Sequence, residues 1–356
     1  MLKKCLFIYI TFVLIFSIHC LSSVKAQNTQ KDCNIRQYSY YTNLAELAII
    51  DSTYQKALSY YDSAFSNIHS PFIRDRYNES VCNAITGNYQ KCKSGVVYLI
   101  EKGLTRDRFK DNQAFSSFLL SDYGKDILEQ NIKPTYDTIL RAKYDSIFEA
   151  DQFFRKLHPT NYHDYYHDTI LNIDASNVKL MNELIERYGW PTMDLIGAYD
   201  FGISAGFQII IIHQGNHIYQ VYNYAEDLLD AYESCLIEPD RAQFLIASSN
   251  SSNELSVNFS GLITVVLDSL VLSNRENYRS FQHKTGFLNI PDEKLAVINQ
   301  ERKAFGLESI GDLRRKVLYS QKDKRFYFQF SGGIQFLTMP NKEDYNHLSK
   351  NLIDNY

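Results

Sequence analysis

Apolar and small residues recur at helical spacing in the first third of the chain. They comprise Tyr41, Leu44, Ala45 and Ala48 and, after a polar break at Asp51 and Ser52, Ala57, Tyr61, Ala64 and Phe65. Spacings of three and four residues place these side chains on one face of a helix. The pattern predicts two amphipathic helices joined by a short turn. Ala45 and Ala57 are expected where the two antiparallel helices approach most closely.

A second unit follows the first and has the same design. Residues Tyr77 to Leu104 predict two helices around a turn at Gly87 and Asn88, and Asp111 to Leu128 predict capping helices. In its spacing of aromatic and small residues the first unit resembles a tetratricopeptide repeat, and the second resembles the terminal repeat of such an array. The resemblance implies a concave surface that binds peptides. Two alternatives stay open: the helices are generic antiparallel pairs, or a short array packs its faces on the next domain.

The second half of the chain carries a further set of motifs. They are Asp151-Gln152-x2-Arg155, a helix opened by Asp174-x2-Asn177 that ends in Tyr188-Gly189-Trp190-Pro191, and an apolar stretch from Ala205 to His213-Gln214. This succession, from roughly residue 145 to 315, is similar to an uncharacterised bacterial domain family of exported Bacteroidota proteins. The resemblance implies a helical architecture and candidate residues without a reaction. The chain departs from the family at Leu245–Ser249 and Asn274–Gln282, where relatives carry further polar motifs.

These motifs supply the candidate site residues. Asp151, Arg155, His213 and Gln214 are the catalytic candidates, and Trp190, Tyr188 and Asn177 are the binding candidates. Each has a structural alternative: an i,i+4 salt bridge for Asp151 and Arg155, a helix junction filled by Trp190, and a favourable helix-dipole position for His213. Gly189 is expected to end its helix in the left-handed conformation.

Two histidine pairs have a spacing that zinc can use. His163 and His167, and His213 and His217, are each four residues apart, which places both rings on one helical face. Neither pair has a clear third ligand nearby, and Gly215 disfavours an uninterrupted helix through the second pair. They are weak metal candidates, and no cofactor is expected.

The C-terminal part changes from helical to alternating periodicity. Arg325 to Phe330 and Ile334 to Met339 alternate around Ser331-Gly332-Gly333, which predicts a β-hairpin, and Asp344 to Ile353 predict a last helix. The expected fold is mainly α-helical. Its expected divisions are a signal peptide (1–26), a tetratricopeptide-like region (27–140), a helical domain (141–320) and the hairpin with its terminal helix (321–356).

The first 26 residues have the organisation of a secretory signal peptide. Lys3 and Lys4 precede a mostly apolar run, and Val24-Lys25-Ala26 places small residues before the expected cleavage site. Cleavage removes three lysines and no acids, so 34 basic and 41 acidic residues remain and the formal charge is −7. This balance argues against nucleic acid as a partner. No later apolar run reaches the length of a transmembrane helix.

Four cysteines remain after cleavage, and an exported chain can form disulfides. Cys82 and Cys92 are close in sequence and are expected on adjacent helices, so they are the disulfide candidate. The alternative is that they are two small buried residues at a tight helix contact.

The sequence therefore favours an exported interaction module, located in the periplasm or outside the cell, with an unknown protein or peptide partner. The rival interpretation is a hydrolase-like or metal-dependent enzyme with a cleft around Asp151, Arg155 and His213. An enzyme requires these polar groups to converge, whereas a binding module tolerates their dispersal.

Overall fold

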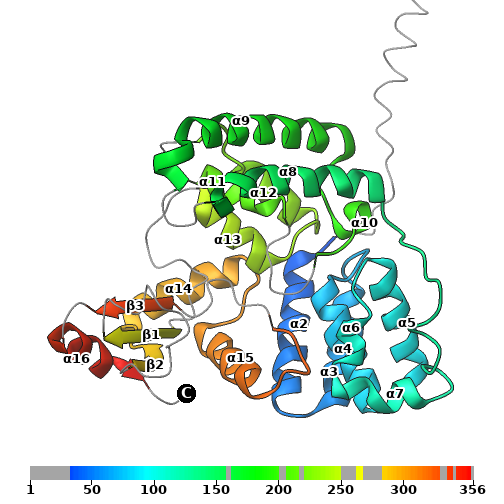
Figure 1. The fold of residues 1–356 in the computed structure, drawn as a ribbon. Coiled ribbons are helices and arrows are strands. Elements are labelled where there is room, and N and C mark those ends of the chain that lie inside the picture. Colours follow the sequence, from blue (N-terminus) through cyan, green and yellow to red (C-terminus); the bar gives the residue numbers. More distant parts are fainter. Residues whose placement is uncertain are drawn as a thin grey trace, which may run out of the picture.

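The computed structural model describes residues 33–157, 162–199, 206–215, 220–249, 262–267, 283–328, 335–339 and 342–353. In these residues the protein is mainly helical and carries a small sheet (Figure 1). The expected fold class is thereby confirmed. The expected signal peptide lies outside the described residues. Among the described helices, none combines the length and apolar character that a membrane crossing requires.

The N-terminal region consists of two helical hairpins followed by short helices. The hairpins are α2 (Ile35–Ile50) with α3 (Tyr54–Phe65) and α4 (Ile73–Ile85) with α5 (Tyr89–Glu101). The short elements are α6 (Asp107–Lys110), the 3-10 helix η1 (Gln113–Phe115) and α7 (Ser116–Leu120). The two hairpins lie where the periodicity predicts them. The predicted capping helices are shorter than expected, because residues 121–128 form turns.

Small residues allow close contacts between these helices. Ala45 and Ala57 are fully buried, as the spacing predicts, and Gly87 adopts a positive φ of 76° in the turn between α4 and α5. Gly95 of α5 faces Ser80 of α4 so closely that a Cβ atom there would overlap the Ser80 hydroxyl. Helix α5 therefore has room for no side chain at this point.

Replacing Gly95 by alanine is expected to lower the free energy of unfolding by about 1–2 kcal/mol, because the new methyl group overpacks the α4–α5 contact. Chemical denaturation of the single variant measures this loss. In a Ser80→Ala background the hydroxyl is gone, so the same change at Gly95 should cost clearly less. Equal losses in both backgrounds would mean that the contact is not tight.

The second helical region lies beside the first (Figure 1). Its elements are α8 (Thr138–Leu157), α9 (Tyr162–Tyr188), α10 (Met193–Ile196), α11 (Gln208–Gln214), α12 (Ala225–Glu233) and α13 (Pro239–Ser249). Gly189 ends α9 with a φ of 86°, as expected from the Gly-Trp-Pro sequence. Helix α2 belongs to both regions, since Ile35 and Tyr38 enter the core of the second region while Ala45 and Ile49 enter the core of the hairpins.

The C-terminal part contains a four-stranded mixed sheet. Its elements are β1 (Leu262–Leu267), β2 (His283–Leu288), α14 (Asp292–Ala304), α15 (Ile310–Lys322), β3 (Gln335–Met339), α16 (Lys342–Lys350) and β4 (Leu352–Ile353). The strand order is β3-β1-β2-β4, with β1 antiparallel to β2 and parallel to β3. The predicted terminal helix is confirmed as α16, although the chain returns to a strand at Leu352. The sheet also joins residues from both sides of the expected boundary at 320.

The predicted β-hairpin is wrong. Its second strand exists as β3, but β3 pairs in parallel with β1 and not with the segment that begins at Arg325. Residues 325–328 form no strand, and Asn78 of α4 instead holds the backbone of Tyr327 by hydrogen bonds of 2.8 and 2.9 Å. Phe326 and Phe328 are buried in the core of the hairpins. The aromatic pattern therefore reflects a segment that packs Phe326, Tyr327 and Phe328 on the hairpin core, and the glycine turn lies outside the described residues.

The disulfide prediction also needs correction. Cys82 and Cys92 are both buried and unbonded at the contact between α4 and α5, which is the structural alternative for this pair. A disulfide instead joins Cys33, just before α2, to Cys235, just after α12, across a sequence separation of 202. This bond ties the start of the described chain to the second helical region.

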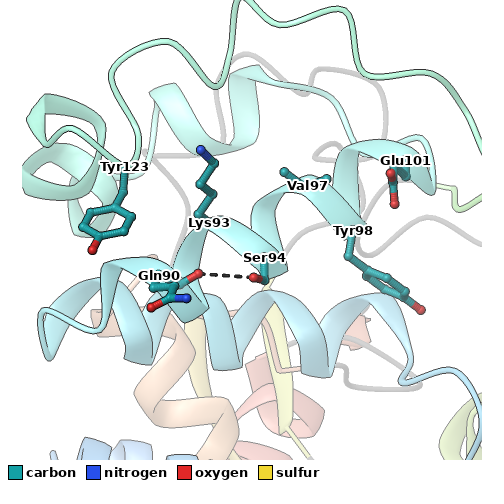
Figure 2. Close-up of a pocket in the computed structure, with 7 residues that line it drawn as sticks. All are labelled: Gln90, Lys93, Ser94, Val97, Tyr98, Glu101 and Tyr123. Carbon is teal, nitrogen blue, oxygen red and sulfur yellow. Dashed lines mark hydrogen bonds between the residues drawn. The ribbon is translucent and has the colours of Figure 1, made fainter.

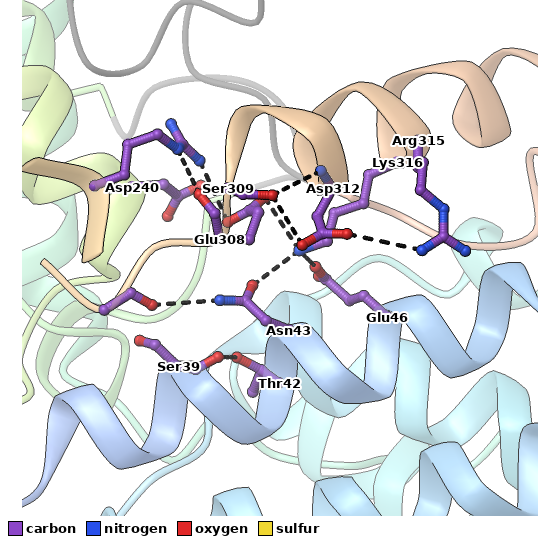
Figure 3. Close-up of polar contacts among 12 residues, drawn as sticks. Ser39, Thr42, Asn43, Glu46, Asp240, Glu308, Ser309, Asp312, Arg315 and Lys316 are labelled. Carbon is purple, nitrogen blue, oxygen red and sulfur yellow. Dashed lines mark hydrogen bonds and ion pairs between the residues drawn. The ribbon is translucent and has the colours of Figure 1, made fainter. Parts of the chain in front are cut away.

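A network of buried charges joins α15 to α2 (Figure 3). The Lys316 side chain is 2% exposed, and its ammonium group lies between the carboxylates of Glu46 and Glu308, with the Glu308 oxygen 3.1 Å away. Asn43 of α2 also accepts a 2.8 Å hydrogen bond from Lys316. The nearby cations Lys316 and Arg302 outweigh the effect of burial and hold the pKa of Glu308 down to about 2. The C-terminal part is thus anchored to the N-terminal hairpin by paired charges.

Candidate functional site

Four polar side chains from three helices converge at one point. Asp151 and Arg155 come from α8, Asp174 from α9 and His213 from α11. The Asp151 Oδ1 atom lies 2.8 Å from His213 Nδ1 and 3.0 Å from Arg155 Nη1, and Arg155 Nη2 lies 2.8 and 3.0 Å from the two Asp174 oxygens. Three of the four predicted catalytic residues are therefore in direct contact. We call Asp151, Arg155, Asp174 and His213 the α8–α11 cluster.

The helical pattern explains why the two acids of this cluster are buried. Leu140, Tyr144, Ile147 and Asp151 form the buried face of α8, so Asp151 continues an apolar stripe. Asp174 likewise shares the buried part of α9 with Ile170 and Val178. An acid on a core-facing stripe needs a partner, because burial of an unpaired charge is costly. Asp174 was not among the predicted site residues. Its position between Ile170 and Val178 on one helix face is the sequence signal that could have identified it.

Burial and charge act in opposite directions on the cluster. The exposed fractions are 1% for the Asp151 side chain, 8% for Asp174, 11% for Arg155 and 26% for His213. Burial raises the pKa of Asp174, whereas its hydrogen bonds to Arg155 and the charge of Arg155 lower it. Two buried carboxylates thus share one guanidinium group, and the histidine is the most exposed member of the cluster.

The contact between Asp151 and His213 fixes the orientation of the imidazole ring. With His213 neutral, a proton on Nδ1 donates to Asp151 and leaves the Nε2 lone pair available. Gln152 donates a 2.6 Å hydrogen bond to the other oxygen of Asp151. Chemically, such an oriented imidazole can accept a proton or bind a metal ion.

The other predicted residues have structural contacts. The Gln214 side-chain oxygen accepts hydrogen bonds from the backbone of Val221 and Tyr222 at 2.7 and 3.3 Å. Trp190 is buried and packs edge-on against Phe207, with ring centroids 6.3 Å apart, as expected for a residue that fills a helix junction. Asn177 is buried and donates a 3.3 Å hydrogen bond to the Ile147 carbonyl oxygen of α8.

Tyr188 differs from these residues because its side chain is partly exposed at the end of α9. The cations of Lys143 and Arg187 lie 6.0 and 5.2 Å from the centre of its ring. The structure thus places Tyr188 at the surface, apart from the core that contains Trp190.

One histidine of each predicted pair, His167 and His213, has a described side chain. His217 and the side chain of His163 lie outside the described residues, and His167 is exposed on α9. The structure instead brings His213 together with Asp151 and Asp174, so that one ligand atom from each of the three lies within 4.8 Å of the others. Sequence spacing missed this group because its members come from three separate helices.

A second candidate site is an open groove along α5 (Figure 2). It has a volume of about 580 Å³ and is lined by Gln90, Lys93, Ser94, Val97, Tyr98, Glu101 and Tyr123. The six α5 residues recur at intervals of three and four, and therefore form one stripe of the helix. Tyr123 lies opposite the Gln90 end and is half exposed. We call this surface the α5 groove.

Comparison of the chain with protein-family models, with curated proteins and with solved structures gave no match.

Proposed function

We propose that the protein is an exported interaction module that binds an extended peptide segment of a partner protein in the α5 groove. The observation that carries this proposal is the groove itself, an open surface along α5 of the second helical hairpin. The resemblance of the hairpins to tetratricopeptide repeats supports a peptide ligand. The organisation of the first 26 residues supports export to the periplasm or the cell exterior.

The chemistry of the groove indicates what kind of segment it would bind. Lys93 and Glu101 lie eight residues apart on α5, which is about 12 Å along a helix. Neither side chain has an ion-pair partner among the described residues. Val97 lies between them on the same stripe, and Tyr98 and Tyr123 add aromatic surface. The groove thus offers one positive and one negative end with apolar contacts between them.

A complementary peptide would carry an acid and a base in a fixed order. An extended chain rises by about 3.3 Å per residue, so four residues span the distance between Lys93 and Glu101. The acid would contact Lys93, the base would contact Glu101, and apolar or aromatic side chains would contact Val97 and the tyrosines. Gln90 and Ser94 add hydrogen-bonding groups at the edge.

Reversing both charges of the groove is expected to reverse the preferred order of charges in the peptide. Selection from a displayed random peptide library identifies the motif bound by the unaltered protein, and the same selection is repeated with the Lys93→Glu/Glu101→Lys double variant. The variant should bind the original peptide about tenfold more weakly, which corresponds to about 1.4 kcal/mol. Its own selected motif should carry the base and the acid in the opposite order.

Lys91→Glu is the matched control, since Lys91 lies on the same helix outside the groove and pairs with Asp62 at an exposed site. This control should retain the original motif and affinity. Selection of no motif, or of the same motif by the double variant, would contradict a peptide-binding role for the groove.

A second candidate function is enzymatic, and one observation favours it: Asp151, Arg155 and His213 are in contact, as an active site requires. His213 would act as the proton acceptor, oriented by Asp151. Replacing His213 by glutamine would then abolish any hydrolytic activity found with a panel of ester, amide and glycoside substrates, without changing peptide binding in the α5 groove.

A further inference from the structure

We propose that Asp151, Asp174 and His213 form a binding site for one Zn²⁺ ion. This inference does not rest on the interaction function of the α5 groove, because the two sites share no residue. It concerns the α8–α11 cluster, in which a carboxylate from α8, a carboxylate from α9 and an imidazole from α11 face one another.

The types and positions of these groups suit zinc. Zinc in proteins is bound by histidine nitrogens and carboxylate oxygens at about 2.0–2.2 Å, so neighbouring ligand atoms of a tetrahedral site lie about 3.4 Å apart. The three candidate ligand atoms already lie within 4.8 Å of one another. Small side-chain rotations, with the proton of the neutral His213 ring moved from Nδ1 to Nε2, therefore bring the three ligand atoms to zinc-binding distances.

The charge of the cluster also favours a cation. Two buried aspartates face a single guanidinium group, and the three together carry one excess negative charge when both acids are ionised. Arg155 and a zinc ion would compete for the same carboxylate oxygens. Arg155 lies in the last turn of α8, two residues before the helix ends at Leu157. Its side chain can thus turn towards solvent when zinc binds.

Zinc can reach the cluster through its most exposed member. His213 is the most exposed residue of the cluster, with 26% of its side chain open, against 11% for Arg155. Three protein ligands leave a fourth position for water, as in catalytic zinc sites, whereas structural sites use four protein ligands. With His213 as a zinc ligand, a zinc-bound water would take the place of the imidazole as the reactive group of the enzymatic candidate function.

Calorimetric titration of the metal-free mature protein with ZnCl₂ tests the proposal. We expect one zinc ion per chain, a rise in the midpoint of thermal unfolding with added zinc, and visible absorption bands of tetrahedral Co²⁺ after cobalt substitution. His213→Gln and Asp174→Asn should each weaken zinc binding by at least about tenfold. His347→Gln, which changes an exposed histidine of α16, is the matched control and should bind zinc like the unaltered protein.

Arg155→Met provides a separate test, because it removes the cation that competes with zinc. This variant should bind zinc more tightly than the unaltered protein, and zinc should restore stability lost with the ion pairs. Absence of stoichiometric zinc binding to the unaltered protein would overturn the proposal, and so would equal binding by His213→Gln and His347→Gln. Either result would leave the peptide selection with the α5 groove unaffected, so the two proposals fail separately.

Discussion

Replacing Lys316 by methionine is expected to lower the free energy of unfolding by about 3–5 kcal/mol, the cost of breaking a buried ion pair by removing one partner. Lys316 is 2% exposed and contacts both Glu46 and Glu308. Methionine fills a similar volume, so the loss reports the missing charge and not a cavity. Urea denaturation followed by circular dichroism measures the change.

The reason for this large effect is that two buried carboxylates lose a common counter-ion. Burial raises the pKa of Glu46, and the charge of Lys316 is the largest opposing influence. Glu308 keeps Arg302 as a partner at 3.4 Å, whereas Glu46 keeps Arg74 at 3.7 Å, which also pairs with Asp75 and Asp240, so the loss of Lys316 affects Glu46 more. A Glu46→Gln/Lys316→Met double variant should therefore regain part of the stability that the single variant loses.

Lys303→Met is the control for this prediction, because Lys303 is exposed on α14. Its effect should stay within about 0.5 kcal/mol, as for most surface substitutions. A loss below about 1 kcal/mol for Lys316→Met would show that the buried network contributes little to stability.

Removing the disulfide between Cys33 and Cys235 is expected to lower the free energy of unfolding by about 2–5 kcal/mol. The bond closes a loop with a sequence separation of 202, and the unfolded chain gains much conformational freedom when so long a loop opens. Equilibrium unfolding of the Cys33→Ala/Cys235→Ala variant, compared with the unaltered protein under oxidising conditions, measures the loss.

A reducing agent provides the control for the disulfide. Dithiothreitol should destabilise the unaltered protein by about as much as the double substitution does, and should not change the stability of the double variant. Cys82 and Cys92 should react with thiol reagents only after unfolding, because both are buried and burial raises the pKa of each thiol. Equal stability with and without reductant would contradict the prediction.

Local sequence patterns were sufficient for much of the fold. The spacing of Ala45, Ala57 and their neighbours predicted α2 and α3, and the pattern in Tyr77–Leu104 predicted α4 and α5, because a helix face is defined by residues three and four positions apart. Gly189 marked the end of α9 for a related reason, since its positive φ is a property of that residue and its turn. Features within about ten residues of each other could thus be predicted from the sequence.

Long-range pairings could not be predicted in the same way. Alternation in Ile334–Met339 indicates a strand but does not identify its partner, and β3 pairs with β1 about 70 residues earlier. Strands β1 and β2 themselves were not predicted. The partner of Cys33 likewise cannot be deduced from spacing when it lies at Cys235. Chain entropy and packing of the whole molecule decide such pairings, and no local pattern records them.

The candidate site lies between these two cases. The contact of Asp151 with Arg155 follows from their spacing on one helix, whereas the approach of Asp174 and His213 depends on how α9 and α11 pack on α8. The motifs therefore contain all four residues, and three of the four were predicted as site residues, but the motifs did not indicate their mutual distances. The residues of the α5 groove were not predicted, because the groove depends on the position of Tyr123 relative to α5.

The division of α2 between two cores has a consequence for the cooperativity of folding. Ile35 and Tyr38 pack with the second helical region, and Ala45 and Ile49 pack with the hairpins. A rigid helix cannot leave one core while it keeps its full contacts in the other. The two helical regions therefore behave as one cooperative unit, in which partial unfolding of either region exposes apolar surface of its neighbour.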